Sequence, residues 1–188
     1  MKRSANTSWQ LDYEDDQVVG HLRHDMEWSM DCPARDVWPY FKDFNLWHED
    51  LTYDGVIGDR EGKSVDFTIK PDGPFKDFTP IFASDDEMQN FRKHLRICKI
   101  IPEHLIIFDS VGLDKTHKMD SYYVFSLREL DGGTRITIAM IYAPFVSARK
   151  DEAQLVTWFQ AVRTNVDDRW DELYIPKLRA LVEKRRAS

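Results

Sequence analysis

The chain has 188 residues, a formal net charge of -7 and two cysteines, and its length suits one domain with a full hydrophobic core. The acidic balance argues against nucleic acid as a partner, because that binding draws on Lys and Arg to neutralise phosphates. No apolar run approaches the ~20 residues that span a bilayer, no secretory leader is evident, and two cysteines form no disulfide framework. We therefore expect a cytoplasmic protein.

Residues 1–16 are mostly polar and are expected to form a loose arm in front of a single domain at 17–188. From Val18 onward, apolar and polar residues alternate, which predicts a half-buried strand with its apolar parity facing the core. The residues expected to face inward are Leu22, His24, Met26, Trp28 and Met30.

Two short helices are expected after this strand. Pro33 stands at or near the first position of the first helix, where a backbone N–H is not needed, and Trp38 belongs to the buried face. Pro39 should shorten or distort this helix, because proline interrupts the hydrogen bonds of a helix interior. Asp43 is a suitable N-cap for a second helix that carries Trp47.

Strand patterns resume after these helices and continue to Ala143. The expected strands span residues 52–57, 64–70, 92–101, 105–111, 121–130 and 134–143. A turn at Asp131-Gly132-Gly133 predicts a hairpin between the last two. The stretch 71–89 is rich in Pro and Gly and is expected to be a long loop, a kind of segment that is uncommon in compact domains and often functional.

The final stretch, 151–184, predicts the element around which the other elements are organised. Its apolar residues recur at a spacing of about 3.6, which is typical of a helix with one broad buried face. Pro176 predicts a kink near Glu172, because proline removes one backbone donor. The strands need an apolar cover, so we expect an α+β fold in which a curved antiparallel sheet of about seven strands wraps around this long helix.

Three motifs, in this order, resemble the START-like or Bet v 1-like superfamily (SRPBCC), which includes bacterial polyketide cyclase/dehydrase and lipid-transport-like proteins. They are the first strand followed by residues 32–47 (CPARDVWPYFKDFNLW), the late hairpin at 132–137 (GGTRIT) and the terminal helix. The resemblance covers residues 20–184, and Pro39 and the loop 71–89 depart from it. It implies the helix-grip fold, with a cavity between sheet and helix for sterols, lipids, polyketides or aromatic compounds. The fold alone does not choose among these ligands.

A ligand in such a cavity meets mainly apolar side chains and a few polar ones. The residues expected to line the pocket are Trp28, Met30, Trp38, Phe67, Phe125, Ile138, Met140, Tyr142, Trp158 and Phe159. The expected acid–base residues are His48, His24, Tyr123 and Arg163. Histidine suits proton removal near neutral pH, and Tyr or Arg can steady an oxyanion. Structural alternatives stay open: His48 as a surface histidine, His24 as a core histidine, and the pocket residues as ordinary core.

Other chemistries find little support in the sequence. The histidines form no convincing metal site, no glycine-rich phosphate loop joins a strand to a helix, and no cofactor is expected. His94, Arg96 and Cys98 share one face of their strand, but the pattern does not tell which face is inward, and the same holds for Asp109. Cys98, within an apolar strand, is expected to be an inert buried thiol.

Three functional hypotheses remain open. The first is a cofactor-independent cyclase, dehydratase or lyase acting on an aromatic or polyketide-like substrate, since His, Tyr and Arg occur at inward positions. The second is a non-catalytic binding or transport protein for a lipid or other hydrophobic ligand, with the loop 71–89 as its lid. The third is an interaction protein with a collapsed cavity and an exposed apolar patch. A hydrophobic or aromatic small molecule is the expected partner, and a homodimer is left open.

Overall fold

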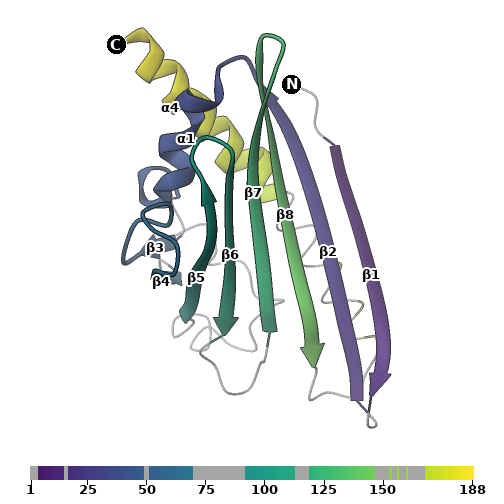
Figure 1. The fold of residues 1–188 in the computed structure, drawn as a ribbon. Coiled ribbons are helices and arrows are strands. Elements are labelled where there is room, and N and C mark those ends of the chain that lie inside the picture. The colour runs from purple at the N-terminus through teal and green to yellow at the C-terminus, as the bar shows by residue number, and fades with distance from the viewer. Residues whose placement is uncertain are drawn as a thin grey trace.

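An eight-stranded antiparallel sheet forms the body of the protein, and the helices pack against one side of it (Figure 1). The computed structural model describes residues 4–14, 17–48, 51–69, 92–112, 119–146, 153, 156, 160 and 168–188. The strands are β1 (Ser4–Glu14), β2 (Gln17–Met30), β3 (Leu51–Tyr53), β4 (Ser64–Ile69), β5 (Arg92–Ile101), β6 (Leu105–Gly112), β7 (Met119–Leu130) and β8 (Gly133–Val146). Their order in the sheet is β1-β2-β8-β7-β6-β5-β4-β3. The α+β helix-grip architecture predicted from the sequence is confirmed.

The N-terminal segment is a strand. β1 pairs with β2 along its whole length and adds the eighth strand to a sheet for which about seven were expected. The interpretation of residues 1–16 as a loose arm is therefore wrong for Ser4–Glu14. The strand pattern was hard to recognise because the inward positions near Trp9 and Leu11 include the polar Thr7. Backbone pairing with β2 stabilises a segment that buries little apolar surface of its own.

Two short helical segments follow β2, as predicted. α1 (Ala34–Lys42) contains Pro39 and ends where the Asp43 N–H bonds to the Pro39 carbonyl. Trp38 lies at the margin of its buried face and is partly buried. The second segment is a single 3₁₀ turn, η1 (Phe44–Leu46), and the Asp43 carboxylate caps it by accepting a hydrogen bond from the Asn45 N–H at 3.1 Å.

The continuously described part of the C-terminal helix contains η3 (Arg169–Tyr174), which is π-helical, and α4 (Ile175–Ala187). The wide turn closes with a hydrogen bond from the Ile175 N–H to the Trp170 carbonyl. Pro176 follows directly and has no N–H to donate to the preceding turn, so a wider turn accommodates its ring. The distortion predicted near Glu172 is thus present, and it takes the form of a π-helical turn.

Part of the predicted helix lies outside the described residues. This holds for most of the stretch before residue 168, including its expected start at Asp151, and also for the loop 71–89. Among the helices that the structure does describe, none combines the length and the apolar character needed to cross a bilayer.

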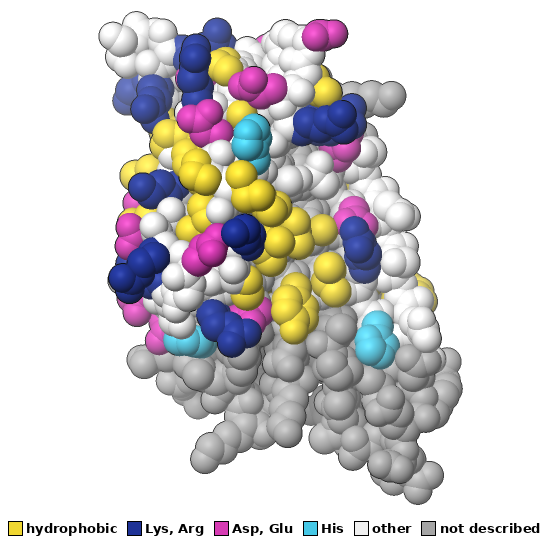
Figure 2. All heavy atoms as spheres, in the orientation of Figure 1, with side chains coloured by type: hydrophobic (Ala, Val, Ile, Leu, Met, Phe, Trp, Pro, Cys, Tyr) yellow, Lys and Arg dark blue, Asp and Glu magenta, His cyan; other side chains and the backbone are white. Residues whose placement is uncertain are grey.

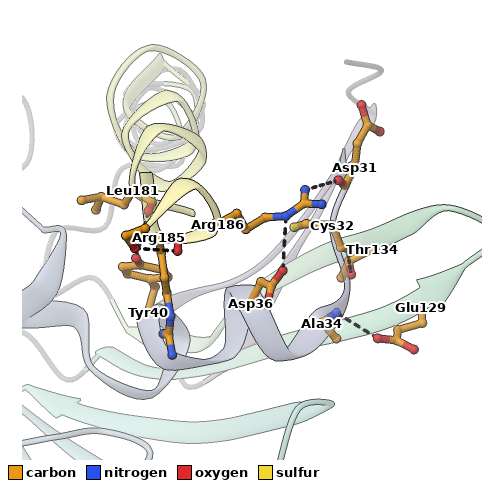
Figure 3. A network of polar contacts seen from close by, with 11 residues as sticks. Asp31, Cys32, Ala34, Asp36, Tyr40, Glu129, Thr134, Leu181, Arg185 and Arg186 are labelled. Carbon is orange, nitrogen blue, oxygen red and sulfur yellow. Dashed lines mark hydrogen bonds and ion pairs between the residues drawn. The ribbon is translucent and has the colours of Figure 1, made fainter. Parts of the chain in front are cut away.

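Polar contacts join α1, α4 and the end of β2 (Figure 3). Tyr40 Oη on α1 donates to the Leu181 carbonyl on α4 at 3.1 Å. Arg186, near the end of α4, donates from Nη1 to the Asp31 carbonyl at 2.9 Å, and its Nε lies 3.6 Å from the Asp36 carboxylate. The terminal helix is therefore bonded both to α1 and to the end of β2.

The β7–β8 hairpin supplies the hydrogen bonds that the start of α1 lacks locally, since the N-cap residue Pro33 makes no side-chain cap bond. The Ala34 N–H donates to Glu129 Oε1 at 3.0 Å, and Thr134 Oγ1 donates to the Cys32 carbonyl at 2.6 Å. Figure 3 shows both bonds crossing from the helix start to the hairpin. The hairpin therefore fixes where the first helix begins.

We expect Gly133→Ala to destabilise the protein, because a Cβ at this position would lie 2.3 Å from the Met30 carbonyl oxygen. The backbone must shift to relieve such an overlap, which typically costs about 1–3 kcal/mol. Gly55→Ala is the control, because its Cβ would meet nothing nearer than 3.4 Å. Urea unfolding of both variants checks the prediction, and equal midpoints would contradict it.

The two faces of the sheet carry different kinds of side chain. The concave face carries the core, as the alternation in the strands predicted. On the outer face, the positions in the middle of the sheet hold partly exposed apolar side chains, which Figure 2 shows gathered over its centre. These residues are Leu105, Ile107, Tyr122, Val124 and Ile141. Charged side chains lie on either side of them, among them Arg23 and Asp25 on β2.

Candidate functional site

A row of polar side chains crosses the concave face of the sheet. The register places Thr7 of β1 opposite His24 of β2, His24 opposite Met140 of β8, and Met140 opposite Tyr123 of β7. Directly opposite residues of an antiparallel pair point to the same face. We call Thr7, His24, Met140 and Tyr123 the polar row. It contains two of the four residues predicted to do acid–base chemistry.

A residue of the edge strand β1 contacts the His24 side chain and holds it in place. Its side chain is buried, with 2% exposure, and its Nδ1 lies 2.7 Å from Thr7 Oγ1. This bond fixes the ring, and the tautomer decides which of the two groups donates. Sequence reasoning found His24 by its parity but missed Thr7, because the partner lies on a strand that was taken for a loose arm.

Tyr123 has a second hydroxyl beside it. Ser121, two positions earlier on β7, is fully buried, and its Oγ lies 3.5 Å from Tyr123 Oη. The Tyr123 ring is stacked on Phe108, with 5.0 Å between the ring centroids. Ser121 was not predicted, although its odd parity on β7 could have found it. The Tyr123 phenol therefore stands between an aromatic face and a hydroxyl group.

The neighbouring row of the concave face is wholly apolar. Its members, from β2 to β6, are Met26, Ile138, Phe125 and Ile106, and all are buried. Trp28 is fully buried one step further along β2, and its indole N–H donates to Asp171 on the terminal helix at 2.9 Å. Met30 is also buried, and Phe67 is partly buried at the β4 side. The concave face thus places polar groups at a few positions in an apolar surface.

His48 belongs to a separate aromatic cluster beyond η1. Its ring is stacked between those of Phe44 and Tyr174, with centroids 4.6 Å and 4.5 Å away. Its Nδ1 lies 2.9 Å from Tyr53 Oη. The side chain is buried, with 6% exposure, and Trp47 also contacts it. His48 is therefore an interior group that joins η1, β3 and the terminal helix.

The structure does not join all the predicted acid–base residues into one set. Phe44 contacts Phe108, on which Tyr123 is stacked, so this pair of rings lies between His48 and the polar row. Arg163, Trp158 and Phe159 lie outside the described residues, and so does the side chain of Tyr142. His24 and Tyr123 remain as the pair that the register brings to one row.

The structure shows which face of β5 and β6 points inward, a question that the sequence pattern could not answer. Leu95, Ile97, Ile106 and Phe108 are buried in the core, so the alternate residues lie on the outer face. There, Arg96 forms a salt bridge with Asp109, and His94 Nδ1 lies 2.5 Å from Asp66 Oδ1. Within the described ranges, no three His, Cys, Asp or Glu side chains gather as a metal site.

The expectation that Cys98 is buried is wrong. Cys98 is exposed, and the core positions of β5 are taken by Leu95 and Ile97 instead. A register shift between Ile97 and Lys99 also leaves Cys98 at an irregular position of the strand. Cys32 is the buried thiol, and burial, followed by the nearby Asp36 carboxylate, raises its pKa.

We expect iodoacetamide to modify Cys98 and to spare Cys32 in the folded protein at pH 8. The thiolate is the reactive form, so a buried thiol with a raised pKa reacts slowly, whereas an exposed thiol reacts readily. Peptide mapping by mass spectrometry measures the two sites separately. Both should react in urea. Faster labelling of Cys32 without denaturant would contradict the assignment.

Solved structures similar to this chain share its fold at low sequence identity. Protein CV1439 from Chromobacterium violaceum aligns over 86% of this chain and 96% of its own, with 15% identity and a TM-score of 0.58. Ms6760 from Mycobacterium smegmatis aligns over 94% and 96%, with 20% identity and a TM-score of 0.55. DynU16, a protein from the dynemicin biosynthetic locus, aligns over 85% of this chain and 46% of its own, with 12% identity and a TM-score of 0.50. These likenesses show the fold alone.

No protein-family model matches the chain, and no curated protein matches it either. The observed sheet and terminal helix fit the helix-grip fold that the resemblance to the START-like superfamily implied. The function is consequently argued from the concave face itself.

Proposed function

We propose that the protein binds an apolar or aromatic small molecule against the concave face and acts on it as a cofactor-independent cyclase, dehydratase or lyase. The observation that carries this proposal is the polar row, which sets an imidazole and a phenol on either side of Met140. The adjoining row is apolar. A binding surface with a few placed polar groups in apolar surroundings is typical of small-molecule sites.

His24 is the proposed general base. Its neutral imidazole removes a proton from a carbon next to a carbonyl group of the ligand, and the electron pair of that C–H bond forms an enolate. Tyr123 is the proposed oxyanion partner, because its hydroxyl can donate a hydrogen bond to the enolate oxygen. In a dehydration, the enolate expels a hydroxyl group, which takes the proton back from the His24 imidazolium and leaves as water. In a cyclisation, the enolate carbon attacks a second carbonyl, and the alkoxide that forms takes that proton instead.

The spacing of the two residues suits a flat ligand. β2 and β7 are separated by β8, so the two backbones lie about 10 Å apart. A ring system between the two side chains would lie over Met140, whose flexible thioether adapts to aromatic surfaces. The Thr7 bond to His24 keeps the imidazole from turning away. This arrangement favours an aromatic or polycyclic ligand over a single extended lipid chain.

Non-catalytic binding of a lipid or other hydrophobic ligand is the second candidate. It is favoured by the apolar row of Met26, Ile138, Phe125 and Ile106, which offers no polar group at all. Under this alternative, the imidazole and the phenol only orient the ligand. The two candidates make different predictions for the effect of replacing His24.

A thermal-shift experiment with two ligand panels tests the proposal. One panel holds hydroxylated naphthalenes and anthracenes with a carbonyl group, and the other holds saturated fatty acids. A ligand at about 100 times its Kd stabilises the folded state by about 2.7 kcal/mol, which raises Tm by roughly 5–10 °C in a protein of this size. We expect the aromatic panel to do so. The proposal fails if neither panel shifts Tm.

Tyr123→Phe should weaken the aromatic hits, since it removes only the hydroxyl group. Tyr122→Phe is the matched control, because Tyr122 is the adjacent residue, is 45% exposed and lies on the outer face. Equal effects of the two substitutions would show that the ligand binds elsewhere.

A further inference from the structure

The two edges of the sheet differ in how they are protected against pairing with another strand. β3, at one edge, has three residues, whereas β1, at the other edge, has eleven. Within the part of the chain that the structure describes, β1 pairs with β2 alone, and Figure 1 shows it running alongside β2 at the margin of the sheet. Natural sheets keep edge strands from pairing by making them short or by placing charges, prolines or bulges on them. β3 is short, and β1 is not.

β1 also lacks the other protective features over most of its length. Its first eight residues, Ser4–Leu11, include no charged residue, no proline and no glycine. Its pairing with β2 runs without a register shift. Trp9, on the inward parity, keeps 42% of its surface exposed. A long, uncharged and regular edge with an exposed indole is a template for the addition of a further strand.

We infer that the added strand is β1 of a second copy, which joins antiparallel so that two sheets become continuous. Antiparallel pairing of identical strands follows a two-fold axis perpendicular to the sheet and gives a closed dimer. The charges favour this direction. Two acidic residues, Asp12 and Glu14, stand at the end of the strand. An antiparallel partner sets the acidic ends of the two strands apart, whereas a parallel partner would set them opposite each other.

The same axis sets residues of equal parity opposite each other. Trp9 therefore lies beside inward positions of the second copy, such as Ala5 or Leu11, and the joined concave faces bury its exposed surface. Thr7 lies on the same side of β1 and contacts His24, so the dimer contact adjoins the polar row. The inference rests on the edge strand and holds whether or not the proposed chemistry is correct.

Sedimentation velocity of the full chain over a wide concentration range tests this inference. We expect the wild type to sediment as a dimer and Trp9→Lys to associate at least tenfold more weakly, because a charge at this edge must be desolvated against its own copy. Tyr122→Lys is the matched control, since Tyr122 is 45% exposed but lies on the outer face of β7. It should remain dimeric. A monomeric wild type, or loss of the dimer in Tyr122→Lys alone, overturns the inference.

A second variant covers the case in which Trp9→Lys fails to fold. Asn6 and Ser8 are exposed on the outward parity of β1, so Asn6→Lys with Ser8→Lys leaves the core untouched. The pair places four lysines side by side across the two-fold axis and should weaken the dimer by tenfold or more at low salt. Circular dichroism confirms the fold. A folded double variant that dimerises as tightly as the wild type contradicts the assignment.

Discussion

Trp47→Ala lowers the free energy of unfolding by about 3–5 kcal/mol, the usual cost of deleting a buried aromatic side chain. Trp47 is 1% exposed, and its ring contacts those of Trp170 and Tyr174 on the terminal helix, with centroids 5.8 Å away in both cases. Its indole N–H donates to the Tyr40 carbonyl at 2.7 Å. The substitution therefore removes a contact between η1 and the helix and leaves a buried carbonyl without its donor. Urea unfolding gives the loss, and Tm should fall by roughly 10 °C.

Two further variants at this place sharpen the measurement. Trp47→Phe keeps an aromatic ring but removes the donor to Tyr40, so we expect an intermediate loss of about 1–3 kcal/mol. Leu46→Ala is the control, because Leu46 is the adjacent residue and is 51% exposed. Its loss should stay within about 0.5 kcal/mol. Losses of stability that decrease from Trp47→Ala through Trp47→Phe to Leu46→Ala would confirm that the aromatic cluster holds η1 against the terminal helix. Equal losses would contradict this.

His24→Asn should reduce the rate of α-proton exchange in a bound aromatic ketone by about 10²–10⁴-fold, the usual contribution of a general base. The amide can still bond to Thr7 but takes up no proton near neutral pH. Nuclear magnetic resonance of the ligand in deuterated water measures the exchange. Binding, read from the thermal shift, should change only a few-fold. This split between rate and affinity separates catalysis from mere binding.

His21→Asn is the control for that experiment. His21 is on the same strand but has the opposite parity, opposite Gln10, and so faces away from the concave side. It should exchange the ligand proton at the wild-type rate. If His24→Asn also exchanges at that rate while binding is kept, the second candidate function, non-catalytic binding, is correct.

Local pattern was enough to predict β2, most of the later strands and the first helix, but not β1. The alternation in β2 predicted five inward residues, and the structure buries all of them: Leu22, His24, Met26, Trp28 and Met30. The turn at Asp131-Gly132 predicted the β7–β8 hairpin, where Gly132 has a φ of 83°. Such signals depend on neighbours in the sequence, which is why they can be found without coordinates.

Contacts between distant segments could not be predicted in the same way. Thr7 meets His24 only because β1 joins the sheet, and His48 meets Tyr53 and Tyr174 only because η1, β3 and the terminal helix converge. Asp171 was likewise not predicted, although it accepts from Trp28 across the sheet–helix contact. The candidate site was therefore predicted by residue type and parity, while the partners that hold each residue follow from the tertiary structure.

The wide turn in the C-terminal helix decides which of its later residues reach the core. Each residue of a π-helical turn advances by a smaller angle about the axis than the ~100° of an α-helix. Ile175 and Val182 consequently lie closer to the side of the helix that carries Trp170 than they would in a regular α-helix. Both are buried, whereas Leu173 and Leu181 are only partly buried. A relative with one residue fewer at this turn would present a different stripe to the sheet. Alignments of such relatives should therefore allow a one-residue gap here.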